Sequence, residues 1–320
     1  MKILIIGLEC GGYAKQRFEM QKEAYAYCSA FGAETPGYAE ERARWADMGI
    51  PVFDTLDTAI NVFQPELAVI GVPNTVKNDL SIERRLIEYK IPVMEYKFRI
   101  RDYNAFRSFA EEIRKQNVPL YVGEPYLYRD CVRYLRRKLP EWNLGRVEHV
   151  RWRCARDGEG APWMRTYRHL ALEDLGLHHL SVLHGLLNLT GADVQARSLS
   201  PKKGGDMRGT ICEEWMKLAS GTTVSHSIDW NGAMDETDWL GTICIECEHG
   251  GVTVKDNRIW LERWGEKPQE IQWELKPLNP LEDVIALLNE GKAENIQLLA
   301  EFMPVIETID KAIRSAEAEK

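Results

Sequence analysis

The first twelve residues of the 320-residue chain place the strongest constraint on its fold. Residues 2–6 form a short apolar run that ends at Gly7, and a helical pattern begins at Tyr13. Between them lies the turn Gly7-Leu-Glu-Cys-Gly-Gly12. A strand, a glycine-rich turn and a helix in this order bring backbone amides and the positive end of a helix dipole to one point. The opening therefore predicts the first unit of an α/β domain, with a turn suited to binding an anionic phosphate group.

The spacing of this turn is close to the pattern G-x-G-x-x-G, which lets a backbone approach a pyrophosphate. Gly7 and Gly12 fill the first and last glycine positions, and Gly11 precedes the last one. Glu9 occupies the middle position, where its side chain adds bulk and negative charge beside a pyrophosphate. We predict that Gly7, Glu9, Cys10, Gly11 and Gly12 line a dinucleotide site; a tight turn without a ligand is the alternative.

Strands and helices alternate through the first 123 residues. Apolar strand-like stretches follow the opening unit at 24–31, 51–53, 67–72, 91–95 and 119–123, and helical patterns occur at 40–48, 55–63, 79–89 and 103–116. Such alternation indicates a parallel sheet with helical crossovers. Residues 1–123 are therefore predicted to form a Rossmann domain, a doubly wound parallel sheet that binds a dinucleotide.

The pattern changes after residue 123. Stretches that alternate between apolar and polar residues, separated by Gly, Asp and Asn, occur at 147–154, 209–218, 222–229, 241–248, 252–255 and 258–263. Helical patterns occur at 130–138, at 173–189 and in a final pair over 281–317. Residues 124–320 are therefore predicted to form an α+β domain built on a mostly antiparallel sheet.

Composition and charge exclude several classes of protein. Hydrophobic residues make up 44% and charged residues 28%, which is the balance of a globular chain. The formal net charge of -8 provides no basic footprint for nucleic acid. No apolar run approaches the roughly 18 residues of a membrane span, and the opening run is too short for a signal peptide. Seven cysteines without framework spacing favour a reducing compartment, so we expect a cytoplasmic protein.

Polar residues follow two strands at the predicted carboxyl edge of the first sheet, where ligands bind in open α/β folds. Val72-Pro73-Asn74 ends one strand, and Glu95-Tyr96-Lys97 ends the next. A lysine at this edge can polarise a carbonyl or hydroxyl group through its charge. Glu34 is the nearest acid, by position, for holding a ribose hydroxyl. A simple Pro-Asn turn and solvated side chains are the alternatives, and NAD and NADP are not distinguished.

Asp174 and His178 are the strongest candidates for acid–base chemistry. They are four residues apart in a predicted helix, so they lie on one helical face. A carboxylate beneath an imidazole fixes its tautomer and raises its basicity, as a general base for a hydroxyl proton requires. A helix-capping aspartate beside a structural histidine is the alternative.

The loop before this helix contains Trp163 and Arg165. A tryptophan ring can line the apolar face of a sugar-like molecule. The predicted substrate contacts are therefore Lys97, Trp163, Arg165, Asp174, His178 and His179.

No metal site is predicted. Cys244-Ile-Glu-Cys247 has the spacing of a metal or redox pair, but it lies in a strand pattern. Residues three apart in a strand face opposite sides, so we expect ordinary strand cysteines. A third ligand with suitable spacing is also missing near His178 and His179.

Taken together, these residues resemble the Gfo/Idh/MocA family of NAD(P)-dependent oxidoreductases, which act mainly on sugars and cyclitols. The resemblance covers nearly the whole chain, including the glycine turn, Pro73-Asn74 and Asp174-Leu-Gly-Leu-His178-His179. It implies that the second sheet is large and open-faced and packs into homodimers or homotetramers. It also implies that His178 is the general base or proton relay, Asp174 its partner and substrate contact, and Tyr126 a neighbour of the nicotinamide.

The chain departs from the family pattern at three functional positions. Glu9 replaces the middle glycine of the turn. The family's Glu-Lys-Pro motif reads Glu95-Tyr96-Lys97 here, so Lys97 is displaced by one position or the catalytic lysine is absent. In the helix motif Asp-x-Gly-x-His-x-x-Asp, Ser181 replaces the final acid.

The leading hypothesis is an enzyme that transfers hydride between NAD or NADP and a hydroxyl-bearing carbon of a sugar, cyclitol or related metabolite. His178 would take or give the hydroxyl proton. A catalytically idle or repurposed relative that binds a metabolite or partner protein is the second hypothesis. The third is an enzyme that keeps the cofactor but performs other chemistry, such as imine reduction.

Overall fold

The computed structural model describes residues 1–7, 25–28, 38–71, 80–96, 103–158, 162–201, 205–232 and 236–318. Contacts divide the chain into two compact units. The first contains Met1–Ile100, Asn104–Glu124 and Leu278–Glu301, and the second contains Arg101–Tyr103, Pro125–Pro277 and Phe302–Lys320. Leu278–Glu301 thus belongs with the first unit, although it lies within residues 124–320, which were predicted to form one domain.

The sheet of the first unit contains, among the described residues, the strands β1 (Ile3–Ile6), β2 (Tyr25–Cys28), β3 (Val52–Phe53), β4 (Leu67–Ile70), β5 (Val93–Glu95), β6 (Leu120–Val122) and β15 (Gln297–Leu298). Their order is β15-β6-β5-β4-β1-β2-β3. Only the short β15 is antiparallel to its neighbour. The order reverses at β1, which pairs with β2 on one side and β4 on the other. This is the strand order of a Rossmann sheet, so the predicted fold class is confirmed.

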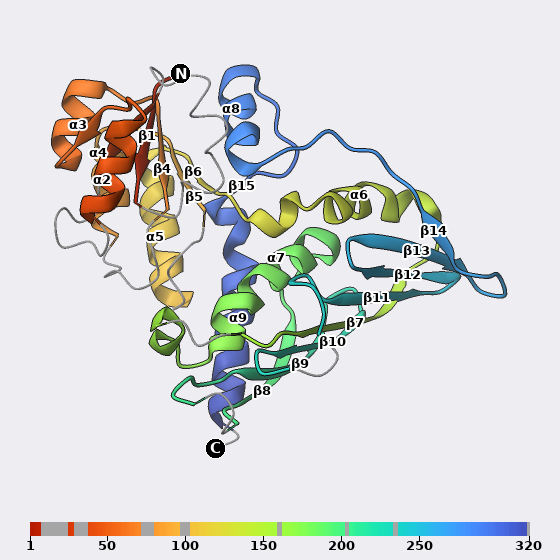
Figure 1. Cartoon of the computed structure of the whole chain (residues 1–320). Coiled ribbons are helices and arrows are strands. Elements are labelled where there is room, and N and C mark those ends of the chain that lie inside the picture. The colour runs from red at the N-terminus through yellow and green to blue at the C-terminus, as the bar shows by residue number, and fades with distance from the viewer. Residues whose placement is uncertain are drawn as a thin grey trace. The chain divides into compact units, whose positions relative to one another are not determined.

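Amphipathic helices accompany these strands: α2 (Tyr38–Asp47), α3 (Leu56–Phe63), α4 (Ser81–Glu88) and α5 (Tyr103–Gln116) (Figure 1). The first turn of α3 is stabilised because the hydroxyl of Thr55 accepts the Thr58 N–H at 3.2 Å. Every residue of β1 and β4 is buried, which explains why these strands appear in the sequence as continuous apolar runs.

The segment that returns to the first unit contains helix α8 (Pro280–Glu290) and β15. The side chain of Asn279 caps the start of α8. The buried Asp283 carboxylate accepts backbone N–H bonds of 2.7–2.8 Å from residues 294–296, which leads the chain toward β15. Apolar side chains of α8 join the core around β1, namely Leu281, Val284 and Ile285. A single cut in the sequence therefore does not describe the two units.

The sheet of the second unit contains β7 (Val147–Ala155), β8 (Asp193–Leu199), β9 (Ile211–Lys217), β10 (Thr223–Asp229), β11 (Thr242–Cys247), β12 (Gly250–Lys255), β13 (Arg258–Arg263) and β14 (Gln269–Ile271). Their order is β14-β13-β12-β11-β7-β10-β9-β8. All neighbours are antiparallel except β7 and β10, which are parallel. The prediction of a mostly antiparallel sheet is confirmed, although β8 and β14 were not expected.

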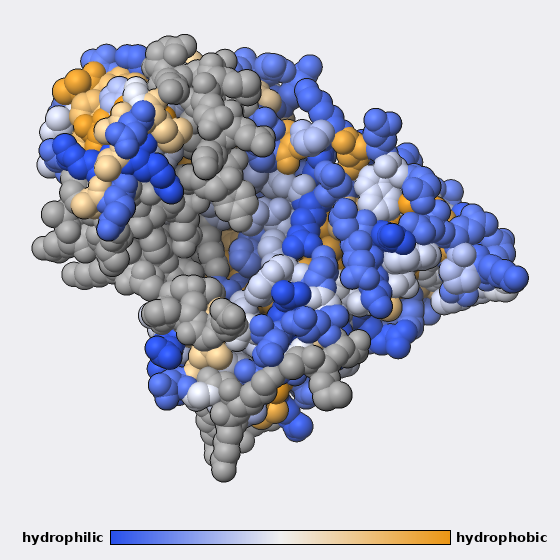
Figure 2. All heavy atoms as spheres, viewed as in Figure 1, coloured by the Kyte–Doolittle hydropathy of each residue, from blue (hydrophilic) through white to orange (hydrophobic). Residues whose placement is uncertain are grey.

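One face of this second sheet is covered by helices. Helix α9 (Met303–Ala318) packs against β8, and helix α7 (Gly176–Leu187) packs against α9 (Figure 1). The strands alternate accordingly: Cys212, Glu214 and Met216 of β9 are buried, whereas Glu213 and Trp215 are exposed. Hydrophilic side chains make up most of the coloured surface of this unit in Figure 2. Among the helices that the structure describes, none has the length and apolar character needed to cross a membrane.

Candidate active site

Gly7 lies at the carboxyl end of β1, at the point where the strand order reverses. Its φ of 92° falls in the left-handed region that favours glycine, and its N–H donates to the Cys28 carbonyl at 3.3 Å. Dinucleotides bind at such switch points, beyond the carboxyl ends of the strands. The conformation and place of Gly7 therefore fit the first glycine of a dinucleotide turn.

Most of the predicted cofactor residues lie outside the described part of the chain: Glu9, Cys10, Gly11, Gly12, Glu34, Val72, Pro73 and Asn74, together with Lys97. Their roles remain predictions. Glu95 is described and ends β5 at the same edge as Gly7, with only 2% of its surface exposed. The backbone carbonyl of Glu95 accepts the Gly123 N–H at 2.8 Å, which ties β5 to the end of β6. The structure thus places Glu95 at the predicted sheet edge.

The segment around Asp174 is not a regular α-helix. Residues Ala171–Leu175 form a π-helical turn, in which the Gly176 N–H donates to the Ala171 carbonyl, and α7 starts directly after it. Single π-turns are frequent at functional sites. Asp174 is buried, and its Oδ1 accepts the hydroxyl of Tyr167 at 3.0 Å. The wider turn changes the geometry on which the predicted pairing of Asp174 and His178 depends, so that pairing remains a prediction.

His178 is half-buried and stacks on Tyr126. The ring centroids are 4.6 Å apart and the planes differ by 13°. The Arg129 guanidinium lies 4.6 Å from the centroid of the same tyrosine ring, and its Nη1 is 2.8 Å from an oxygen of Asp238. Tyr126 therefore contacts both an imidazole and a guanidinium, and this arrangement limits the orientations of the His178 ring.

His179 has a different environment from the one predicted. It is fully buried, with Nδ1 2.9 Å from His226 Nε2 and Nε2 3.0 Å from the Trp239 carbonyl oxygen. Trp152 stacks on it with ring centroids 4.6 Å apart. Burial, followed by the charge of His226, holds the pKa of His179 well below its usual value. Since both ring nitrogens are engaged by protein groups, this placement does not fit the predicted contact between His179 and substrate.

A third side chain extends this buried cluster. His226 Nδ1 lies 2.5 Å from Glu214 Oε2, and both residues are at most 4% exposed. Glu214 and His226 were not among the predicted site residues. The sequence did contain a signal for them, because each is a polar residue at an inward position between apolar neighbours, as in Val224, His226 and Ile228.

Of the predicted substrate contacts before the helix, Arg165 is exposed in the short 3-10 turn Pro162–Thr166. The side chain of Trp163, in the same turn, lies outside the described residues. Cys244 is half-buried and Cys247 is buried, so they face opposite sides of β11 as expected. In the described residues we find no group of three or more His, Cys, Asp or Glu side chains placed to hold a metal ion.

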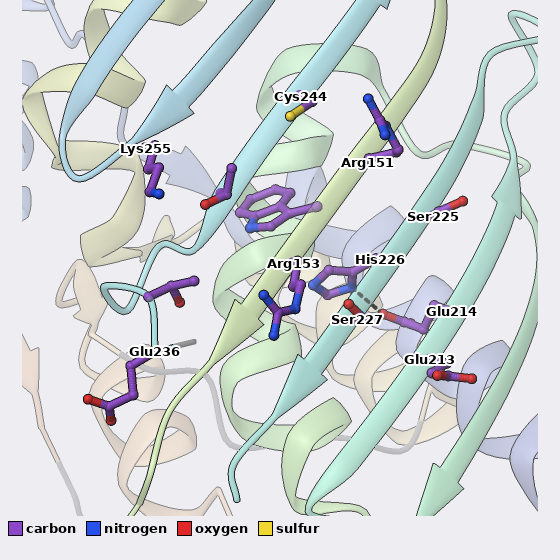
Figure 3. A pocket seen from close by; sticks show the side chains of 13 residues that line it. Arg151, Arg153, Glu213, Glu214, Ser225, His226, Ser227, Glu236, Cys244 and Lys255 are labelled. Carbon is purple, nitrogen blue, oxygen red and sulfur yellow. Dashed lines mark hydrogen bonds and ion pairs between the residues drawn. The ribbon is translucent and has the colours of Figure 1, made fainter. Parts of the chain in front are cut away.

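A hollow of about 570 Å³ lies on the second sheet. It is on the face where Glu213 and Trp215 are exposed, opposite α7 and α9, which we call the helix-free face. Figure 3 shows side chains of three neighbouring strands around the hollow, namely Arg151, Arg153, Ser225, Ser227 and Cys244. Trp152 lies between the two arginines in β7 and contacts His179, so it points to the opposite face. Trp152, Glu214 and His226 also line the hollow, so it borders the buried cluster around His179.

Neither a protein-family model nor a curated protein sequence matches this chain. Solved structures do match it along its whole length. An oxidoreductase from Agrobacterium radiobacter, solved with NAD+, L-tartaric acid and magnesium, has a TM-score of 0.82 at 15% identity and covers 100% of this chain and 97% of its own. The chain has the fold of a two-domain oxidoreductase.

Two further structures support the same conclusion about the fold. Aldose-aldose oxidoreductase from Caulobacter crescentus, complexed with glycerol, has a TM-score of 0.78 at 17% identity, with coverage of 100% of this chain and 98% of its own. Biliverdin reductase from Synechocystis sp. PCC 6803, in complex with biliverdin and NADP+, has a TM-score of 0.73 at 18% identity, with 99% coverage of both chains. At these identities the likeness establishes the fold, and function has to be argued from the residues.

Proposed function

We propose that this protein is a divergent Gfo/Idh/MocA-type oxidoreductase that uses NAD or NADP to oxidise a hydroxyl-bearing carbon of a sugar, cyclitol or related metabolite, or to reduce the corresponding carbonyl. The observation that carries the proposal is the full-length match to an oxidoreductase solved with NAD+ and a hydroxy acid. The left-handed Gly7 at the switch point and the half-buried His178 are consistent with it.

In this proposal His178 is the general base. When bound, the nicotinamide would supply the hydride acceptor or donor, and the protein would position the reacting groups. His178 would take the hydroxyl proton during oxidation and return it during reduction. Asp174 would contact the substrate, fixed by its hydrogen bond from Tyr167. Lys97, Trp163 and Arg165 are proposed as further substrate contacts.

The proposed cofactor contacts are Gly7, Glu9, Cys10, Gly11, Gly12, Glu34, Val72, Pro73, Asn74, Glu95 and Tyr126. The conformation of Gly7 fits a bound dinucleotide, since its φ of 92° suits a tight turn close to a phosphate. We propose no metal in the reaction, because an imidazole base and a nicotinamide suffice for hydride transfer.

One observation favours the alternative of an idle or repurposed relative, or of an imine reductase. Tyr96, which stands where the family pattern has lysine, packs in the hydrophobic core of the first unit and is only 3% exposed. The side chain at this position therefore supplies an apolar contact where a catalytic cation is expected. If Lys97 does not replace this lysine, the site lacks the catalytic cation that the family pattern provides for alcohol oxidation.

The test is turnover of the full-length protein with NAD+ or NADP+ and a panel of polyols, aldoses and hydroxy acids, followed by nicotinamide absorbance. His178→Ala is expected to abolish turnover and to leave cofactor affinity within about twofold. His249→Ala, at an exposed histidine of the second unit, is the matched control and is expected to behave like the wild type. Undiminished turnover in His178→Ala would contradict the role of the base, and equal loss of turnover and cofactor affinity would indicate a structural histidine.

We further propose that the helix-free face of the second sheet mediates assembly into a homodimer or homotetramer. Trp215, 41% exposed on this face, is an apolar anchor among charged side chains. Light scattering after size-exclusion chromatography is expected to give a multiple of the 36.8 kDa chain mass, and Trp215→Glu to give the monomer. A wild-type monomer would contradict this assembly.

A further inference from the structure

We infer that Glu214 is a positioning residue: through His226 and His179 it maintains a one-directional chain of hydrogen bonds that anchors residues 236–241 to His179, the neighbour of His178 in α7. The chain runs from Glu214 Oε2 to His226 at 2.5 Å, from His226 to His179 at 2.9 Å, and from His179 to the Trp239 carbonyl at 3.0 Å. The link to catalysis rests on the proposed function, whereas the placement of protons rests on geometry alone.

The Trp239 carbonyl fixes the direction of the whole chain. A carbonyl oxygen can only accept, so His179 Nε2 carries a proton and donates. Burial keeps His179 neutral, so its Nδ1 has no proton and accepts from His226 Nε2. Each step therefore determines the protonated nitrogen of the next ring.

One proton must then lie between His226 Nδ1 and Glu214 Oε2. A neutral imidazole that already donates through Nε2 presents a lone pair at Nδ1, which a carboxylate oxygen 2.5 Å away would repel. Either protonated Glu214 donates to His226, or ionised Glu214 accepts from a doubly protonated His226. In both cases the three side chains together carry one proton more than an ionised carboxylate and two neutral imidazoles, and their net charge is zero.

Burial explains why a neutral arrangement is needed. Glu214 is 4% exposed, and within the described residues its Oε1 has no hydrogen-bond partner. An isolated ionised carboxylate in such a place is costly, whereas a carboxyl group that shares a proton with an imidazole is not. Figure 3 shows the Glu214 and His226 contact between neighbouring strands β9 and β10.

The chain of hydrogen bonds ends at Trp239, in a segment that is also linked to His178 through Arg129 and Tyr126. Asp238, next to Trp239, binds Arg129 at 2.8 Å, and the Arg129 guanidinium lies over the ring of Tyr126. Tyr126 in turn stacks on His178. His179 also fixes the backbone beside His178 directly, because the two are consecutive in α7. Loss of the carboxyl group of Glu214 would therefore disturb the orientation of His178 from two directions.

Two substitutions of Glu214 distinguish the effect of its hydrogen bond from the effect of its side-chain volume. Glu214→Gln keeps the size and can donate its amide N–H to His226 Nδ1, so the direction of the chain is preserved. Glu214→Leu has similar bulk but can neither donate nor accept. We expect Glu214→Gln to retain kcat within about threefold, and Glu214→Leu to lose on the order of 10- to 100-fold in kcat with an unchanged KM for the cofactor. Equal kcat in both variants and the wild type would overturn the positioning role.

Nitrogen-15 NMR of the histidine-labelled wild type tests the protons without any need for activity. We expect His179 Nε2 and His226 Nε2 to be protonated and His179 Nδ1 to be unprotonated, with the same pattern in Glu214→Gln. An unprotonated Nε2 in either ring would overturn the proton placement. This result stands even if no substrate is found, so its failure and that of the proposed function can be told apart.

A third variant covers the case in which Glu214→Leu does not fold. Asp238→Asn weakens the half-exposed ion pair to Arg129 at the far end of the path. We expect a lower kcat, an unchanged cofactor KM and unchanged nitrogen-15 signals of His179 and His226. An unchanged kcat in Asp238→Asn would overturn the proposed path to His178.

Discussion

Acid is expected to remove the stability that His179 contributes to the second unit. The side chain is fully buried, and its pKa lies well below the usual value because burial disfavours the charged ring and His226 adds a like charge. In the unfolded chain the same ring titrates near pH 6.5. Below that pH the unfolded state binds a proton that the folded state does not, so the contribution is present above about pH 6.5 and is lost as the pH falls toward the folded pKa.

The size of this effect follows from the unfolded pKa alone, provided that the folded ring stays neutral. At pH 5.5, one unit below about 6.5, the unfolded state gains RT ln 11, or about 1.4 kcal/mol; at pH 7.5 it gains less than about 0.1 kcal/mol. His179→Asn has no such term. It is expected to be less stable than the wild type by about 1–3 kcal/mol at pH 7.5, because the buried Trp239 carbonyl loses its donor.

The assay is urea unfolding of both proteins at pH 7.5, 6.5 and 5.5, followed by tryptophan fluorescence. Nine of the ten tryptophans, all except Trp45, lie in the second unit, so the signal reports mainly on it. Taking the difference between the two proteins cancels the titrating groups that do not contact His179. The stability gap is expected to shrink by about 1.4 kcal/mol between pH 7.5 and 5.5. A gap that stays constant or widens on acidification would refute the argument.

Three further predictions concern single contacts. Trp152→Phe removes the 2.7 Å hydrogen bond from the indole to the buried Leu240 carbonyl and should lower the free energy of unfolding by about 1–3 kcal/mol in urea; an unchanged midpoint would contradict this. Tyr126→Phe keeps the ring that stacks on His178 and should retain kcat, whereas Tyr126→Ala should reduce kcat by about tenfold in the turnover assay; similar values for both would exclude the stack. Gly7→Ala places a side chain at a φ of 92° and should destabilise the first unit by about 1–2 kcal/mol, seen as a lower Tm by circular dichroism; full retention of Tm would show that the strand end adapts.

The sequence predicted the first sheet well because each of its strands carries its own signal. Strands such as Ile3–Ile6 are buried on both faces and stand out as apolar runs. Alternation with helices then leaves few possible topologies. The turn at Asp256-Asn257 in the second sheet also has a local sequence signal, since both residues adopt the left-handed conformation that Asp and Asn tolerate.

Features that depend on distant contacts were missed. Strand β8 has only two buried positions, Val194 and Ala196, among mostly charged and polar residues, so its pattern is weak until β9 and α9 pack against it. The return of α8 and β15 to the first unit depends on Asp283 and on a core built from other segments. Local periodicity contains neither of these contacts.

The candidate site likewise combines features with a local sequence signal and features that depend on distant contacts. The spacing of Asp174 and His178 identified the right helix start, but the π-turn at Ala171–Leu175 depends on packing and is not visible in an i, i+4 pattern. Glu214 and His226 were each visible as polar residues at inward strand positions. That they meet each other and His179 depends on the register of β9 and β10 and on where α7 lies, which a single sequence does not specify.

Binding of the reduced cofactor is the most direct test of the proposed enzyme. The full-length protein is titrated with NADH and with NADPH, and nicotinamide fluorescence is followed in the wild type and in Glu9→Gly. We predict saturable binding of at least one cofactor by the wild type, and tighter binding by Glu9→Gly because a negative charge beside the pyrophosphate is removed. Absence of saturation with both cofactors at millimolar concentration would contradict the proposal that this chain is a nicotinamide-dependent oxidoreductase.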